Sequence, residues 1–130
     1  MASKILFVGH CGPDNSYLRI AVRSAAHDAT VISADDREQF DRALAQGVDL
    51  VLVNRVLDFG FAETNGVELM AGLRRAHPNL KWMLISNHAD AQAAARSAGA
   101  LAGFGKRDIG SAAATAALKN ALDKTAELKS

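Results

Sequence analysis

The chain has 130 residues, of which 49% are hydrophobic, and this is enough for one domain with a sizeable buried core. Fifteen basic and fourteen acidic residues give a formal net charge of +1, which gives no support for binding to nucleic acid or to a membrane surface. The single cysteine, Cys11, excludes an internal disulfide and fits a reducing compartment. The apolar run near the start has only four residues, so we expect no signal peptide, no membrane span and a cytoplasmic location.

Five short apolar runs, separated by turn residues, predict five β-strands. The run Val48–Val53 is nearly continuous and rich in β-branched side chains, which is typical of a strand buried on both faces in the middle of a parallel sheet. Gly103 and Gly105 weaken the last run, so we expect a short fifth strand. The predicted strands end near Val8, Ser33, Val53, Ile85 and Gly105.

Helix-capping residues follow each predicted strand. Asp35 with Glu38 three residues later has the character of a capping box, and Gly99 is a typical C-terminal stop. The predicted helices begin at Asp14 or Asn15, Asp35, Asn65, Asp90, and Asp108 or Ser111, and they end near His27, before Gly47, at His77–Pro78, at Ala98 and near Leu128.

Strands and helices therefore alternate five times along the chain. Parallel neighbours joined by helices need right-handed crossovers, so helices cover both faces of the sheet. We predict an α/β fold in which residues 1–130 form a single domain, a three-layer αβα, doubly wound, five-stranded parallel sheet with the flavodoxin-like strand order 2-1-3-4-5.

Polar residues collect where the predicted strands end, and in open α/β sheets this carboxyl edge is where sites form. No single residue is diagnostic, but the order in which these groups occur is informative. Gly9, His10 and Cys11 follow the first strand, Asn54 ends the third, Ser86 and His88 follow the fourth, and Lys106 follows the fifth.

With these groups in this order, nearly the whole chain resembles the receiver domains of bacterial response regulators (CheY-like domains). The phrase VDLVLVN resembles the strand that ends in the phospho-accepting aspartate, and Asn54 holds that position. The segment NGVELMAGLRR is similar to the helix that follows in the family. Ser86, in LISNHAD, stands at the family's hydroxyl position, and Lys106, which ends AGALAGFGK, stands at its lysine position.

The chain departs from the family at the residues that perform its chemistry. The resemblance implies two acidic residues after the first strand, which hold Mg²⁺, but Gly9 and His10 occupy those positions. Magnesium prefers carboxylate oxygens, so we expect weak or absent Mg²⁺ binding and no other cofactor. The amide of Asn54 is a far weaker nucleophile than a carboxylate, so we expect no acyl phosphate. Gly103 stands where the family usually has a switch aromatic.

Alternatives remain open for three of these positions. Asn54 is either the functional equivalent of the acceptor or a loop starter that bonds its own turn. Asp58, further along the same loop, is the minority candidate for a phospho-acceptor, because using it would stretch the third strand to about eleven residues against a usual five or six. Lys106 can pair with Asp58, with Asp14 or with solvent, and Ser86 can cap the helix that follows it.

Three further features of the rim have both a structural and a functional interpretation. His10, Cys11 and His88 carry imidazole and thiolate groups that could bind a transition metal, but they lack a paired ligand spacing. The loop GHCG could present backbone amides to an anion, although it has no nucleotide-binding motif. Phe59 and Phe61 either pack on the core or form an apolar contact for a partner.

We therefore expect a pseudo-receiver in two-component or phosphorelay signalling that acts by phosphorylation-independent contact with other proteins. The partners implied by the resemblance are a histidine kinase or an output protein, or a second copy bound through residues 89–128. The sequence contains no recognisable pair of a nucleophile and a base, so we do not expect an enzyme. The alternative is a flavodoxin-like domain that binds a small ligand or a metal at the rim formed by His10, Cys11 and His88.

Overall fold

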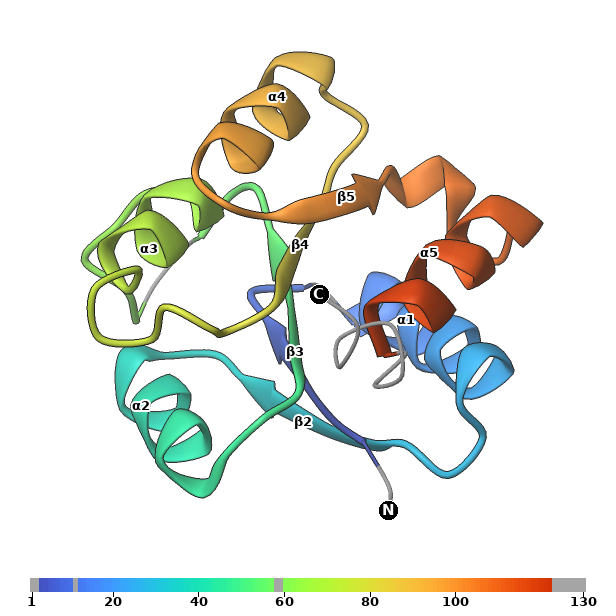
Figure 1. Ribbon diagram of the computed structural model, residues 1–130, viewed down its shortest axis with the longest axis horizontal. Helices are drawn as coiled ribbons and strands as arrows, with labels where there is room; N and C mark the ends of the chain where they lie inside the picture. The colour runs from blue at the N-terminus through green and yellow to red at the C-terminus, as the bar shows by residue number, and fades with distance from the viewer. Residues whose placement is uncertain (1–2, 11, 58–59, 123–130) are drawn as a thin grey trace.

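The computed structural model describes residues 3–10, 12–57 and 60–122. Its strands form one parallel sheet in the order β2-β1-β3-β4-β5, which confirms the predicted fold class and strand order (Figure 1). The strands are β1 (Lys4–Val8), β2 (Thr30–Ala34), β3 (Leu50–Asn54), β4 (Trp82–Ile85) and β5 (Leu101–Phe104).

Helices cover both faces of this sheet. The pair α1 and α5 packs on one face, and α2, α3 and α4 pack on the other (Figure 1). The helices are α1 (Gly12–Ala25), α2 (Arg37–Gln46), α3 (Gly66–Gly72), α4 (Ala89–Ser97) and α5 (Ala112–Leu122), with a 3-10 turn at Lys106–Asp108. None of the described helices is both long enough and apolar enough to cross a bilayer.

The sheet separates two hydrophobic cores, because successive side chains of a strand point to opposite faces. On β1, Leu6 and Val8 pack toward α2, α3 and α4, whereas Ile5 and Phe7 pack toward α1 and α5. The central strand β3 is fully buried over Leu50–Val53, as its continuous apolar run predicts.

The predicted starts of α1 and α2 are wrong by one to three residues. Helix α1 begins at Gly12, so Asp14 lies in its first turn instead of capping it, and Pro13 takes a first-turn position where its missing N–H is not needed. Helix α2 is capped by Asp36, whose side chain accepts a hydrogen bond from the Gln39 N–H, and not by Asp35. Adjacent aspartates offer the same chemistry, so the sequence does not separate them.

The other starts agree better with the sequence. The Asn65 side chain accepts a bond from the Glu68 N–H at 2.9 Å and caps α3. Ser111 Oγ accepts from the Ala114 N–H, which selects Ser111 over Asp108 as the residue before α5. Of the predicted end near Leu128, the part beyond Leu122 lies outside the described residues.

Helix α3 is shorter than predicted. It ends at Gly72 instead of continuing to His77, because glycine is a poor helix former and the Leu73 N–H bonds the Met70 carbonyl in a tighter i→i−3 turn. Helix α1 likewise ends at Ala25 instead of His27.

The last strand pair is irregular. Met83 pairs with Leu101 and Ile85 pairs with Phe104, so a two-residue step on β4 faces a three-residue step on β5. The extra residue makes a bulge on β5 close to Gly103.

Candidate functional site

The carboxyl ends of β3, β4 and β5 meet around a pocket of about 150 Å³. It brings together three of the residues singled out from the sequence at the family-equivalent positions, and His88 lies beside them. Gly9 and His10, which follow β1, do not line it. The lining residues are Asn54, Arg55, Val56, Ile85, Ser86, Asn87, His88 and Lys106.

Asn54 uses its amide to hold the backbone of two loops. Its Nδ2 donates to the Gly9 carbonyl at 3.1 Å and to the Val56 carbonyl at 3.0 Å. The loop after β3 then turns back, since the Gly66 N–H donates to the Arg55 carbonyl at 2.9 Å. The side chain at the acceptor-equivalent position is therefore a donor in structural bonds, which favours its interpretation as a loop residue.

Gly66 allows this loop to close. A Cβ added at Gly66 would collide with the Asn54 carbonyl oxygen and with Val53. Helix α3 can thus start directly against the end of β3 only because residue 66 has no side chain.

His10 points inward instead of toward the pocket. Its Nε2 donates to the Leu52 carbonyl at 2.8 Å, and its ring meets the Phe7 ring edge-to-face at 5.8 Å between centroids. The pKa of His10 is lowered to about 4, mainly by burial and also by the nearby Lys106 charge, against the raising effects of the bond to Leu52 and of the Asp14 charge. At neutral pH this residue is a neutral imidazole, and its buried Nδ1 has no hydrogen-bond partner among the described residues.

These residues do not fit a magnesium site. The two positions after β1 offer a glycine and an inward-facing neutral imidazole, and Asn54 turns its amide nitrogen toward the neighbouring carbonyls. Mg²⁺ needs oxygen ligands, usually carboxylates, in octahedral geometry. We therefore keep the expectation that Mg²⁺ binding is weak or absent.

Lys106 forms an ion pair with Asp14, which is one of its three candidate partners. Its Nζ lies 2.9 Å from Asp14 Oδ2 in the first turn of α1, and the two side chains are 37% and 20% exposed. Asp58, the other acidic candidate, lies outside the described residues, so its part in the loop stays a prediction.

Ser86 is 4% exposed and does not cap α4 through the helix amides. Its Oγ accepts from the His88 N–H at 3.1 Å, and the N-cap of α4 is His88, which makes no side-chain capping bond. The Ser86 hydroxyl therefore stabilises the turn between β4 and α4. The sequence analysis had offered it as the cap of α4 itself.

Gln92 is the residue of this region that the sequence analysis missed. Its Nε2 donates to the Leu84 carbonyl at 2.9 Å and to the Ser86 carbonyl at 3.0 Å, and it lies 3.5 Å from the Phe104 carbonyl. One side-chain amide on α4 thus bonds the backbone of β4 and approaches that of β5. No sequence pattern distinguishes a helical glutamine that makes such bonds from one that is exposed to solvent.

Gly103 on β5 lies next to the side-chain amide of Gln92. A Cβ at Gly103 would collide with the Leu84 carbonyl oxygen and would lie 2.9 Å from the Gln92 side-chain oxygen. The position at which the resemblance implies a switch aromatic therefore has no room even for a methyl group.

The alternative metal site is not assembled by the described residues. His10 is turned inward, His88 is exposed on the pocket wall, and Cys11 lies outside the described residues. Within residues 3–10, 12–57 and 60–122, no three His, Cys, Asp or Glu side chains form a metal-binding group.

Phe59 and Phe61 were given two interpretations, packing on the core or contact with a partner. Phe61 packs on the core beside α2, where its ring meets the Phe40 ring edge-to-face with centroids 6.2 Å apart. Phe59 lies outside the described residues.

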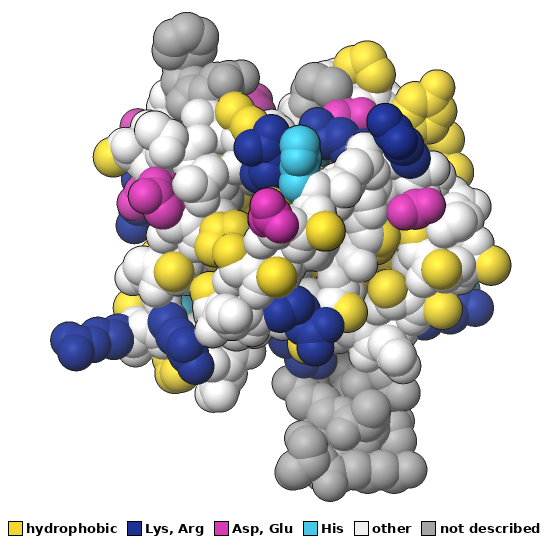
Figure 2. Space-filling model, turned by 90° about the horizontal axis from the view of Figure 1, so that it is seen from above, with side chains coloured by type: hydrophobic (Ala, Val, Ile, Leu, Met, Phe, Trp, Pro, Cys, Tyr) yellow, Lys and Arg dark blue, Asp and Glu magenta, His cyan; other side chains and the backbone are white. Residues whose placement is uncertain are grey.

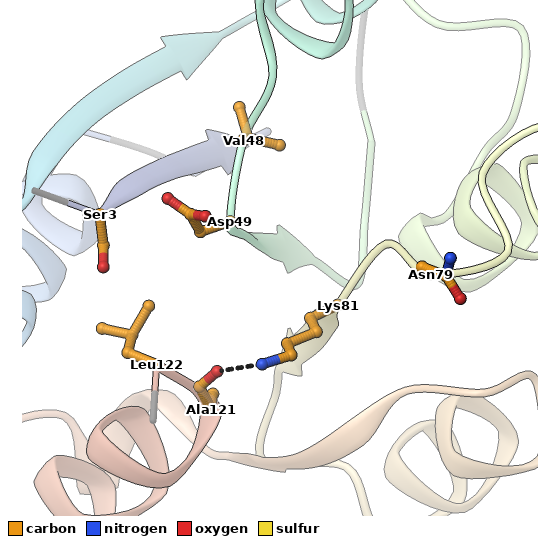
Figure 3. A pocket seen from close by; sticks show the side chains of 7 residues that line it. All are labelled: Ser3, Val48, Asp49, Asn79, Lys81, Ala121 and Leu122. Carbon is orange, nitrogen blue, oxygen red and sulfur yellow. Dashed lines mark hydrogen bonds between the residues drawn. The ribbon is translucent and has the colours of Figure 1, made fainter. Parts of the chain in front are cut away.

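The opposite, amino edge of the sheet carries a second pocket of about 110 Å³. Lys81 Nζ donates to the Ala121 carbonyl at 3.0 Å (Figure 3). Asp49 accepts from the Lys4 N–H at 2.7 Å. Lys81 thus bonds the last turn of α5, and Asp49 bonds the start of β1. Both charged side chains therefore have a structural role at this edge. The pocket is lined by Ser3, Val48, Asp49, Asn79, Lys81, Ala121 and Leu122 (Figure 3).

No family model and no curated protein sequence matches the chain. Solved structures do match it. The receiver domain of the stress response regulator RcsB from Escherichia coli, in its non-phosphorylated form, superposes with a TM-score of 0.71 at 13% identity, over 92% of this chain and 95% of that one. The chain has the fold of a response regulator receiver domain.

Two further receiver-fold structures support this statement. The signal receiver domain of the DNA-binding response regulator MerR from Colwellia psychrerythraea 34H matches with a TM-score of 0.64 and 16% identity, over 81% of this chain and 86% of that one. HP1043, an orphan response regulator of H. pylori, matches with a TM-score of 0.66 and 13% identity, over 93% and 97%. At these identities the likeness establishes the receiver fold.

Proposed function

We propose that the chain is a receiver-like signalling domain that works by contact with other proteins and without aspartyl phosphorylation. The observation that carries the proposal is the pair of bonds from Asn54 Nδ2 to the Gly9 and Val56 carbonyls. A residue that donates both amide hydrogens to the backbone is part of the scaffold at the position where a working receiver needs a nucleophile. The receiver fold of the structural neighbours supports a role in two-component signalling.

The bonds around α4 support a surface that keeps one conformation. Gln92 bonds α4 to β4, and Gly103 has no side chain at the position where the resemblance implies a switch aromatic. A phosphoryl group changes a protein only by favouring one of two populated states. A face held in this way is suited to constitutive binding.

The face formed by α4, β5 and α5 is the surface we propose for binding. Figure 2 looks onto α4 and β5, and shows hydrophobic side chains distributed over this face between charged ones. Small side chains let another backbone approach closely and lose little entropy on burial. The exposed apolar residues of the three elements are Ala89, Ala93, Ala94, Leu101, Ala102, Ala112, Ala113 and Ala116.

The partner in this proposal is either a second copy of the chain or a signalling protein, which is a histidine kinase or an output protein. Ala94→Glu and Ala113→Glu place a charge on the exposed face and should weaken assembly while the fold stays intact. Ala117 is a less suitable test position on α5, because it is half-buried and packs on the core beside α1.

The experiment combines phosphorylation with assembly. We expect mass spectrometry to find no added phosphoryl group on Asn54 after incubation with acetyl phosphate and Mg²⁺, and analytical ultracentrifugation or a pull-down to find a complex that acetyl phosphate does not change. The matched control is Ala45→Glu, on the exposed side of α2. A phosphoryl group on Asp58, or binding that rises with acetyl phosphate, would overturn the proposal.

A further inference from the structure

Two hollows adjoin at the amino edge of the sheet, on the face that α2, α3 and α4 cover (Figure 1). The narrower hollow has a volume of about 150 Å³ and the wider one about 370 Å³. Both are lined by His77, Pro78 and Leu80, which belong to the connection between α3 and β4. We call the two hollows together the amino-edge groove. Its larger apolar side chains are Leu44, Val48, Met70, Leu73, Leu80 and Trp82.

The size of the groove suits the side chains of a protein segment better than a compact small molecule. A cavity of about 150 Å³ holds one benzene-sized group, whereas small-molecule sites usually measure about 300–1,000 Å³ and enclose most of the ligand. The wider hollow reaches that volume, but Gly47, His77 and Pro78 in its walls are exposed. Two adjoining apolar hollows that open to solvent are suited to two apolar side chains of one peptide.

Trp82 provides the groove with an unused hydrogen-bond donor. Its side chain is 4% exposed and lines the narrower hollow. The indole N–H is its only polar side-chain group. This group forms no hydrogen bond with any described residue, and it is not sealed from solvent. A nearly buried indole N–H usually has a partner, so this one is suited to an acceptor atom of a bound molecule.

Arginine side chains surround the groove. Arg74 lines the narrower hollow, Arg75 follows it, and Arg96 lies in the last turn of α4 beside the same wall. All three side chains are exposed, and none forms an ion pair with a described residue. Guanidinium groups bind carboxylates through two parallel N–H bonds, so these arginines favour a ligand with acidic side chains.

Two features of this edge oppose an acidic ligand. Helices α2, α3 and α4 end here, and each helix C-terminus carries about half a negative charge. Capping turns already bond some of these carbonyls, as the Gly47 N–H does for Leu44 at 3.0 Å. Asp49 lies in the neighbouring pocket, where it accepts from the Lys4 N–H. The three full charges of the arginines outweigh about three half charges, so an acidic ligand remains favoured.

We propose that the amino-edge groove binds an acidic segment of a partner protein. Two apolar side chains of the segment enter the hollows, a carboxylate pairs with Arg74, and an acceptor atom takes the Trp82 indole N–H. Tryptophan and arginine are the residue types most often found where binding energy concentrates. The groove lies at the opposite edge of the sheet from the pocket that contains Asn54, so the inference does not depend on the chemistry at Asn54. It adds a second contact surface to the face formed by α4, β5 and α5.

The test uses the single tryptophan of the chain as its reporter. The probes are short synthetic peptides of glutamate with two leucines, spaced as on one face of a strand or of a helix. Each peptide is titrated into the full chain, and the NMR signal of the Trp82 indole N–H is followed. We expect a saturable shift with at least one of them. The same peptides with lysine for glutamate, or with alanine for leucine, should bind at least about tenfold more weakly.

Variants assign the binding to named groups. Arg74→Glu should weaken binding of the glutamate peptide about tenfold or more, because it replaces an attraction with a repulsion. The matched control is Arg23→Glu, which makes the same change in the last turn of α1 on the other face of the sheet and should alter affinity by less than about twofold. Trp82→Phe keeps an aromatic ring but removes the N–H, so it should also weaken binding, measured by the fluorescence anisotropy of a labelled peptide.

Three results would overturn the inference. They are shifts that never saturate with any glutamate peptide, equal binding of the glutamate and lysine peptides, and equal weakening by Arg74→Glu and Arg23→Glu. An indole signal that moves with protein concentration alone would show that a second copy occupies the groove, which would also overturn the assignment to an acidic partner. The titration contains no phosphodonor, so its outcome is independent of the acetyl phosphate experiment.

Discussion

Gln92 on α4 and Leu84 on β4 are joined by a hydrogen bond of 2.9 Å from the side-chain amide to the backbone carbonyl. The same nitrogen donates to the Ser86 carbonyl at 3.0 Å, beside the irregular pairing of β4 and β5. A single side chain therefore donates to two main-chain carbonyls next to the bulged strand pair.

We expect Gln92→Met to destabilise the protein by about 1–3 kcal/mol, because methionine keeps the length of the side chain but removes the donor of the hydrogen bonds to the Leu84 and Ser86 carbonyls. Hydrogen exchange of the β5 amides should accelerate in the same variant. Urea unfolding measures the first effect. Gln46→Met, at the exposed end of α2, is the control and should change stability by less than about 0.5 kcal/mol. Equal effects at the two positions would contradict the role assigned to Gln92.

Two glycines provide a second test. Gly103→Ala should destabilise the fold by about 1–3 kcal/mol, because its Cβ would collide with the Leu84 carbonyl oxygen. Gly72→Ala, in α3, meets nothing within 4 Å and should stabilise by about 0.5–1 kcal/mol through helix propensity and a less flexible unfolded chain. Thermal unfolding of the two variants measures the destabilisation by Gly103→Ala and the stabilisation by Gly72→Ala. A neutral or stabilising Gly103→Ala would show that β5 can move away from β4.

Restoring the family's residue at the acceptor position should not restore its chemistry. Asn54→Asp replaces the Nδ2 donor with an oxygen that faces the Gly9 and Val56 carbonyls, so we expect a loss of about 1–3 kcal/mol in stability. We also expect no acyl phosphate, since no carboxylate pair follows β1. Urea unfolding and intact-protein mass spectrometry check the two statements. Asn79→Asp, at an exposed position, is the control. A stable variant that gains a covalently bound phosphoryl group would refute this account.

His10 should make the protein sensitive to acid. Its pKa is about 4 in the folded protein, chiefly because of burial, against about 6.5 in the unfolded chain. Below pH 6.5 the unfolded state binds a proton that the folded state does not bind, so stability falls as the pH falls toward 4. The contribution is up to about 3 kcal/mol over this window. Lys106 and Asp14 are the charged groups that act on this ring.

The comparison with His10→Gln isolates this effect. Glutamine keeps an N–H that can donate to the Leu52 carbonyl, but it does not titrate. Urea unfolding between pH 7 and pH 4 should show a shallower loss of stability for the variant than for the wild type. Parallel pH profiles would mean that His10 is accessible to protons in the folded protein.

The strands and their order could be predicted because burial on both faces leaves a direct trace in the sequence, as Leu50–Val53 shows. Asn54, Ser86 and Lys106 could be placed at one edge because parallel strands end there. The partner of Lys106 could not be selected, since it depends on how α1 packs against the end of β5. Gln92 could not be found, because its acceptors are backbone carbonyls whose positions depend on the bulge and not on residue type.

The irregular pairing of β4 and β5 also bears on aggregation. An open sheet has two outer strands whose unpaired backbone groups can recruit strands from other molecules. Here the outer strand β5 has four residues and steps out of register with its neighbour. A short, bulged strand is a poor template for adding another strand, so this edge resists fibril-like growth although Leu101 and Ala102 are exposed on it. The face that we propose for binding can thus include β5 without offering a flat strand edge on that side of the sheet.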